Sequence, residues 1–143
     1  MKAVDILLVE DNPGDVRLTQ EALNEGRIIN KLHVVSDGVE AIDFLSKQGR
    51  FKGAITPDLI LLDLNLPKMN GLEVLEKIKS DEVLKMIPVI VLTTSQSDTD
   101  VHASYSMHVN CFVSKPVEYD SFMNVVKSIE DFWFTIVKLP QLN

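Results

Sequence analysis

The sequence predicts an α/β protein with an open parallel sheet covered by helices on both faces. Three observations support this prediction: short apolar runs of strand length, helix-period segments between them, and a chain length typical of one domain. The chain has 143 residues, of which 45% are apolar, enough for a substantial core. Strands joined by helical crossovers imply a parallel sheet, because each crossover must pack back onto it.

The predicted strands are apolar at consecutive positions, as expected of strands that are buried on both faces. Four runs show this pattern: Ile6–Val9, Leu59–Leu62, Val89–Leu92 and Cys111–Val113. A weaker fifth strand is predicted at Leu32–Val35. The expected sheet therefore has five strands.

The first predicted helix carries its own start signal. Asn12 is a candidate N-cap, Pro13 suits the first helical position, and Val16, Ala22 and Leu23 share one side. Further helical segments are predicted at Val39–Lys47, Leu72–Lys79 and Asp98–Met107, and from Tyr119 onward. Residues Gln48–Pro57 are predicted to form a loop.

Composition excludes several classes of protein. The net charge of −7, from 14 basic and 21 acidic residues, argues against direct binding to nucleic acid. A single cysteine, Cys111 in an apolar run, excludes a disulfide framework and suggests a small core residue. The sequence has no signal peptide and no stretch of membrane-spanning length, so we expect a cytoplasmic protein that does not associate with membranes.

Polar residues end four of the predicted strands. Glu10 and Asp11 follow the first strand and Asp63 the third; the other two strands end in Thr93-Thr94 and Ser114-Lys115-Pro116. Ligands of open parallel sheets bind at the carboxyl ends of the strands, which meet at one edge. Carboxylates, hydroxyls and one ammonium group at that edge suit a hard cation and a phosphoryl group.

The charges of this set favour a bound divalent ion. Two carboxylates about 4 Å apart repel by roughly 4 kcal/mol at an effective dielectric of about 20. Mg²⁺ fits oxygen ligands better than Zn²⁺ does, and the three histidines, His33, His102 and His108, are scattered over the chain. Each residue alone also has a structural interpretation, as an N-cap or a turn residue. The occurrence of the whole set at the strand ends favours a functional site over these separate structural roles.

Four segments of the sequence resemble the signature blocks of response regulator receiver domains: Leu7–Asp11, Pro57–Gly71, Val91–Thr94 and Val113–Pro116. The resemblance extends from about Asp5 to about Glu130. It implies a flavodoxin-like (βα)5 fold with strand order 2-1-3-4-5 and a single receiver domain over residues 1–143. It also implies a role in a two-component phosphorelay with a sensor histidine kinase and a downstream protein partner or relay.

The segment Glu10–Asp15 and the long loop near Gly49 resemble more narrowly the stand-alone regulators that serve bacterial phytochromes. A phytochrome is therefore a possible partner kinase.

The resemblance assigns the chemistry to particular residues. Asp63 is the phosphoacceptor, whose carboxylate attacks the phosphorus of a phosphohistidine. Asp11 and Asp63 ligate Mg²⁺ directly, with the backbone carbonyl of Asn65 as a third protein ligand and Glu10 acting through water. Ser95 and Asn65 flank the attacking water, and because Ser95 is short, only slow self-dephosphorylation is expected. The protein is thus a signalling domain and not an enzyme in the usual sense.

The same resemblance implies a switch. Lys115 pairs with a phosphoryl oxygen, and Thr93, with Thr94 beside it, donates a hydroxyl to another. Phe112 occupies the aromatic switch position, with a plain core phenylalanine as the alternative. The bond before Pro116 is expected to be cis.

Two other residues near the third strand have expected structural roles. Gly71 permits the turn after Asp63, where a side chain would crowd the site. Asp58, at the opposite end of the strand, is expected to be a cap.

Two other classes of protein share part of this pattern. A haloacid-dehalogenase-like phosphohydrolase also uses a strand-end aspartate, Mg²⁺ and a lysine, but it expects an aspartate where this sequence has Asn65. A flavodoxin-like cofactor binder needs a phosphate loop after the first strand, where Glu10 and Asp11 would repel phosphate. The phosphohydrolase remains the alternative function.

The C-terminal part of the chain predicts a homodimer. An apolar stripe repeats there at helical spacing, and a further apolar extension covers about residues 132–143. Burying each large side chain is worth about 1.5–3 kcal/mol, so association is expected, with folding back onto the domain as the alternative. The stripe comprises Phe122, Val125, Val126, Ile129, Phe132, Trp133, Ile136 and Val137, and the further apolar residues are Phe134, Leu139 and Leu142.

Overall fold

The computed structural model describes residues 3–27, 29–93, 111–114, 120, 123–124, 126–128 and 130–131. Its centre is a five-stranded parallel sheet with strand order β2-β1-β3-β4-β5, so the predicted fold and strand order are confirmed. The strands are β1 (Val4–Val9), β2 (Asn30–Val35), β3 (Leu59–Leu62), β4 (Val89–Thr93) and β5 (Cys111–Ser114).

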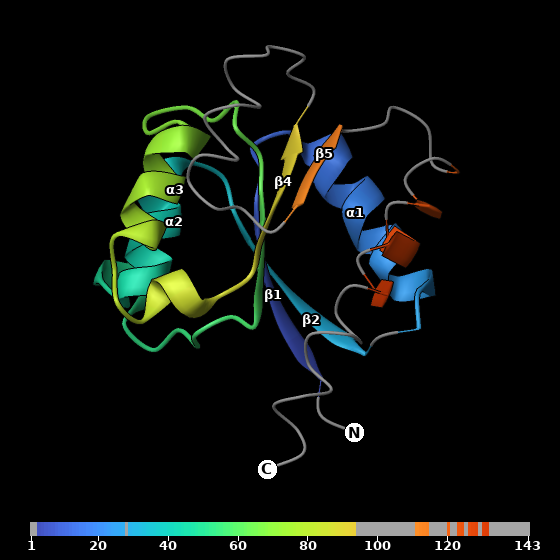
Figure 1. The fold of residues 1–143 in the computed structure, drawn as a ribbon, viewed down its shortest axis with the longest axis horizontal. Coiled ribbons are helices and arrows are strands. Elements are labelled where there is room, and N and C mark those ends of the chain that lie inside the picture. The colour runs from blue at the N-terminus through green and yellow to red at the C-terminus, as the bar shows by residue number, and fades with distance from the viewer. Residues whose placement is uncertain are drawn as a thin grey trace.

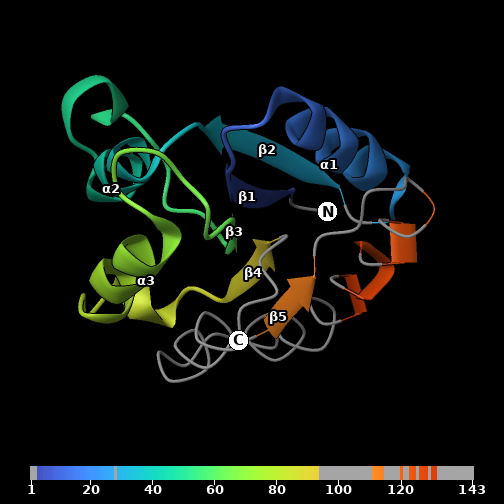
Figure 2. The ribbon, with the colours of Figure 1, turned by 90° about the horizontal axis from the view of Figure 1, so that it is seen from above.

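Helices cover both faces of the sheet (Figures 1 and 2). α2 (Gly38–Ser46) and α3 (Gly71–Lys79) lie on one face, whereas α1 (Pro13–Glu25) and the described residues of 120–131 lie on the other. Alternate residues of β1 enter two separate cores: Leu7 and Val9 pack with the α2 and α3 side, Ile6 and Leu8 with the α1 side. Burial on both faces explains why the strands are apolar throughout.

Side-chain caps set the helix starts. The Asn12 side chain accepts a hydrogen bond from the Asp15 N–H at 3.1 Å, as the predicted N-cap of α1. Asp37 and Asn70 cap α2 and α3 in the same way, so each helix begins at a glycine, one residue before the predicted start. The predicted starts rest on the first apolar residue of the helical period, which passes over a glycine. The capping residue marks the first helical residue directly. The predicted helix Asp98–Met107 lies outside the described residues.

The loop predicted at Gln48–Pro57 contains a short 3₁₀ helix, η1 (Gly49–Phe51). The Phe51 ring packs against Phe44 of α2 with centroids 5.4 Å apart, and the Arg50 guanidinium lies 4.6 Å from the Phe51 ring centroid. Arg50 also pairs with Glu40 of α2. A second 3₁₀ helix, η2 (Leu84–Met86), precedes β4. A single turn has no measurable period, which is why neither was predicted.

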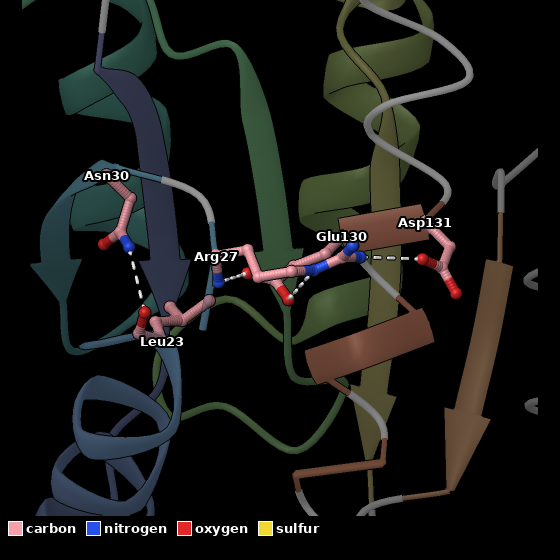
Figure 3. Close-up of polar contacts among 5 residues, drawn as sticks. All are labelled: Leu23, Arg27, Asn30, Glu130 and Asp131. Atoms are coloured by element: carbon pink, nitrogen blue, oxygen red, sulfur yellow. Dashed lines mark hydrogen bonds and ion pairs between the residues drawn. The ribbon is translucent and has the colours of Figure 1, made fainter. Parts of the chain in front are cut away.

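The end of the last helical segment is attached to the end of α1 (Figure 3). The buried carboxylate of Glu130 accepts a hydrogen bond from the backbone N–H of Arg27, and the Arg27 guanidinium lies 3.0 Å from Asp131. A Cβ added to Gly26 would lie 2.3 Å from a Glu130 oxygen, so the approach requires glycine unless Glu130 moves. Val126 is buried in the same core as Ala22 and Leu23 of α1. These contacts join segments more than a hundred residues apart.

Asp58 lies at the opposite edge of the sheet from the predicted site. Its carboxylate accepts from the Asp5 N–H at 2.9 Å, and its own N–H donates to the Asp5 carbonyl at 2.7 Å. The Asp5 side chain also lies 3.0 Å from the Nε2 atom of His33. Asp58 is thus a cap, as predicted, and it joins the beginnings of β1 and β3, 53 residues apart in the sequence.

Among the described residues, no helix is both long and apolar enough to cross a membrane.

Candidate metal and phosphoryl site

The parallel pairing of β1 with β3 brings the first and third strand ends together. Val9 is in register with Leu62, and the Asp63 N–H donates to the Val9 carbonyl at 3.1 Å. The Glu10 N–H donates in turn to Val35 at the end of β2, at 3.0 Å. Glu10 and Asp63 are therefore the first residues beyond two adjacent strands, held there by sheet-like hydrogen bonds.

Three carboxylates gather at this edge. Glu10, Asp11 and Asp63 each offer an oxygen, and the three oxygens lie within 4.8 Å of one another. Glu10 and Asp63 are only 3% and 7% exposed, whereas Asp11 faces solvent. The structure thus brings together the three acidic residues that the sequence predicts as metal ligands.

Backbone N–H groups hold two of these carboxylates in place. Glu10 accepts from the Asn12 N–H at 3.2 Å, and the Asp63 Oδ1 atom accepts from the Asn65 N–H at 3.1 Å. The second bond also sets the backbone of Asn65 next to Asp63. Asn65 itself is exposed, on the loop of residues 64–70 that connects β3 to α3.

The donor set fits a hard divalent cation. At 4.8 Å and an effective dielectric of about 20, two ionised carboxylates repel by ~3.5 kcal/mol, and a cation among them removes this cost. All three side chains offer carboxylate oxygens, the ligands that Mg²⁺ and Mn²⁺ prefer. Because Asp11 is exposed, the cluster is accessible to solvent at this residue.

The turn after Asp63 depends on Gly71. A Cβ at this position would lie 2.4 Å from the Asp63 carbonyl oxygen and 2.4 Å from the Leu64 Cα atom. The Gly71 N–H donates to the Leu64 carbonyl at 2.9 Å and closes the base of the loop. The predicted crowding at Gly71 is confirmed, and its cause is the close approach of two backbone segments.

The remaining predicted residues lie on β4, on β5 or beyond them. Backbone pairing places Thr93 opposite Ser114 and Val91 opposite Phe112. Thr93 thus ends β4 at the same edge of the sheet as Asp63. Thr94, Lys115 and Pro116 lie outside the described residues.

One contact at this edge was not predicted from the sequence. The β3–α3 loop touches the start of α2: Lys68 Nζ lies 3.5 Å from Asp37 Oδ2, and Gly38 packs against the backbone of Met69. Asp37 and Gly38 could have been recognised as a cap and a helix start. Their contacts with Lys68 and Met69 in the loop could not have been predicted, because no local sequence signal encodes them.

Known proteins resemble this chain in sequence and in structure. The family model described as "Response regulator receiver domain" matches residues 6–127. The response regulator Rcp1 of Synechocystis sp. is 49% identical over 135 residues, which cover 94% of this chain and 92% of Rcp1.

Solved structures agree with this match. The phosphorylated cyanobacterial phytochrome response regulator RcpA superimposes with a TM-score of 0.88 at 47% identity, covering 94% of this chain and 96% of RcpA. The Mn²⁺-bound form of Rcp1 gives a TM-score of 0.85 at 48% identity, covering 91% and 94% of the two chains. These matches give no support to the haloacid-dehalogenase-like alternative.

Proposed function

Because this chain belongs to the response regulator receiver domain family, we propose that it accepts a phosphoryl group on Asp63 from a sensor histidine kinase in a Mg²⁺-dependent reaction. The observation that carries the proposal is the cluster of Glu10, Asp11 and Asp63, with oxygens within 4.8 Å, at the ends of β1 and β3. Two-component signalling follows from the family, and this cluster supports the proposed acceptor residue and the proposed metal.

In the proposed transfer, a carboxylate oxygen of Asp63 forms a bond to phosphorus while the bond between phosphorus and the kinase histidine nitrogen breaks. The electron pair of that bond stays on the imidazole. The Asn65 N–H holds one Asp63 oxygen at 3.1 Å and so orients the carboxylate before the attack. The contribution of the protein is positioning and charge balance, as in other phosphoryl transfers.

We assign the metal to Asp11, Asp63 and the Asn65 backbone carbonyl, with Glu10 acting through water. The chemistry that Mg²⁺ supplies when bound is neutralisation of the carboxylates and of the transferred phosphoryl group. The Mn²⁺-bound form of Rcp1 supports a divalent site in this family. The buried Glu10 contributes a charge that solvent screens poorly, which strengthens attraction for the cation.

The switch is proposed from the sequence blocks. Thr93, with Thr94 beside it, and Lys115 contact the phosphoryl oxygens; Phe112 responds by rotating, and the bond before Pro116 is cis. The parallel pairing of β4 with β5 supports coupling between the two strand ends, since Thr93 and Ser114 are direct neighbours.

The partner of the proposed reaction is a phytochrome-type histidine kinase. RcpA is a phytochrome response regulator, and this chain is 47% identical to it over nearly the whole of both chains. We further propose that the receiver acts as a stand-alone homodimer through a downstream partner or relay and that it dephosphorylates itself slowly.

The test is phosphorylation with acetyl phosphate and Mg²⁺. We expect stoichiometric, acid-stable but base-labile label on the wild type and none on Asp63→Asn, which keeps the volume but removes the nucleophilic charge. Asp58→Asn is the matched control, since it changes an aspartate at the other end of β3 and should label normally. Equal labelling of wild type and Asp63→Asn would refute the acceptor assignment. Turnover of a phosphate ester without accumulated label would instead support a hydrolase.

A further inference from the structure

We propose that the start of α2 positions the β3–α3 loop for metal binding, with Gly38 as the principal positioning residue and the Asp37–Lys68 ion pair as its support. The inference rests on the proposed function, because it assumes that the loop supplies the Asn65 carbonyl to Mg²⁺. Neither α2 nor its cap belongs to the acidic cluster. The connection runs through the backbone of the loop.

The loop of residues 64–70 is held at its base. The Gly71 N–H donates to the Leu64 carbonyl at 2.9 Å, and the Asn65 N–H donates to the Asp63 carboxylate at 3.1 Å. These bonds fix the two ends of the loop next to the site. The far part, Pro67–Met69, is held by the Met69 side chain, which packs against the core, and by the contact of Met69 with the start of α2.

The far part of the loop rests on Gly38. A Cβ added to Gly38 would lie 1.9 Å from the Met69 carbonyl oxygen and 2.7 Å from the Met69 carbonyl carbon. These are backbone atoms, so no side-chain rotation relieves the overlap. Gly38 is also in the first turn of α2, where the Asp37 cap fixes the local backbone conformation. The loop and the helix therefore meet at a point with no spare space.

An ion pair reinforces the same contact. One oxygen of Asp37, Oδ1, accepts from the Glu40 N–H at 2.8 Å as the helix cap, and the other, Oδ2, lies 3.5 Å from Lys68 Nζ. Lys68 has a φ of +65°, a left-handed conformation that non-glycine residues rarely adopt. Because the lysine is exposed, the pair contributes less than the backbone contact at Gly38.

Asn65 lies between the two attachments, so the direction of its carbonyl depends on both. If the far attachment is lost, the loop samples conformations in which the carbonyl does not face the acidic cluster. The apparent dissociation constant for Mg²⁺ then rises in inverse proportion to the fraction of molecules with a competent loop. Changes to groups that orient metal ligands typically weaken metal affinity by 10–100-fold.

The experiment compares Gly38→Ala with Gly53→Ala by calorimetric titration with Mg²⁺. Gly53 is the matched control because a Cβ there meets nothing within 4 Å and its φ is not positive. We expect Gly38→Ala to weaken Mg²⁺ binding by about tenfold, the lower end of that range, and Gly53→Ala to leave it unchanged. The Asn65 amide NMR shift in metal-free protein should move in Gly38→Ala alone. Wild-type affinity in a folded Gly38→Ala protein would overturn the inference.

Lys68→Met tests the inference if Gly38→Ala does not fold. Removing a positive charge near the site would by itself tighten Mg²⁺ binding, whereas loss of loop positioning weakens it. We expect binding weaker by less than about fivefold, as the loss of an exposed ion pair allows. Unchanged or tighter binding would overturn the inference. Absence of Mg²⁺ binding by the wild type would refute the proposed function itself, so the two failures are distinguishable.

Discussion

Replacing Asp11 by asparagine should stabilise the metal-free protein and destabilise it relative to wild type in Mg²⁺. The substitution keeps the size of an exposed side chain and removes one charge from a cluster of three carboxylates whose oxygens lie within 4.8 Å of one another. Glu10 and Asp63 are buried, so their charges are screened less than surface charges are. The change in the free energy of unfolding of this variant therefore measures the repulsion between the Asp11 carboxylate and the other two carboxylates.

The magnitude follows from the spacing. At 4.8 Å the repulsion of one pair lies between ~0.9 kcal/mol in water and ~3.5 kcal/mol at an effective dielectric of 20. Asp11 is exposed, so its two pairs lie near the lower limit, and the neighbouring Glu10 also repels it in the unfolded chain. We expect the free energy of unfolding without metal to rise by about 1–2 kcal/mol, or roughly 3–7 °C in Tm for a chain of 143 residues.

The assay is urea denaturation of wild type and Asp11→Asn, in EDTA and in saturating Mg²⁺. A ligand that binds only the folded state at 100 times its Kd stabilises the protein by about 2.7 kcal/mol, so the wild type should become the more stable of the two in Mg²⁺. Glu21→Gln, an exposed change on α1, controls for the general effect of removing one negative charge from a chain of net charge −7.

The expected result is that Asp11→Asn is the more stable protein in EDTA and the wild type is the more stable protein in Mg²⁺. If Asp11→Asn is less stable than wild type in EDTA, the cluster is not electrostatically strained and the charge argument is wrong. If Glu21→Gln gains as much as Asp11→Asn, the gain reflects net charge and not the cluster.

Three further changes test other contacts of the fold. Glu130→Ala should lower the free energy of unfolding in urea by about 1–3 kcal/mol, because it leaves the backbone N–H of Arg27 without its buried acceptor. A loss below about 0.5 kcal/mol, the usual scatter of surface substitutions, would contradict this. Gly71→Ala should cost about 1–3 kcal/mol by overpacking and lower Tm, because its Cβ would lie 2.4 Å from the Asp63 carbonyl oxygen; an unchanged Tm would show that the turn can relax. Hydrogen bonds from the Leu84 and Val83 N–H groups lower the pKa of Asp81 below its usual 3.8, so the stability that its charge adds is present above pH 3.8 and is lost as the pH falls through the lowered pKa. The stability difference between wild type and Asp81→Asn should therefore shrink in acid, and a difference that is constant with pH would argue against this.

The sequence by itself determined the strands, the first helix with its cap and the acidic edge of the sheet. Burial on both faces makes a parallel strand apolar throughout. The N-cap Asn12 marks the start of α1 through a hydrogen bond to Asp15, only three residues further along the chain. Parallel pairing then obliges Glu10 and Asp63 to share one edge, whatever the separation between them in the chain. These properties depend on local composition and on rules that hold for every sheet of this kind.

Only the tertiary structure decided how the segments meet. The contact of Gly38 with Met69, the Asp37–Lys68 pair and the attachment of Glu130 to Arg27 depend on which surfaces packing brings together. The short helix η1 likewise forms where the Phe51 ring packs against Phe44 of α2. No periodic or capping signal encodes such contacts, because each partner has an ordinary local environment and the free energy of the contact appears only when the helices dock on the sheet.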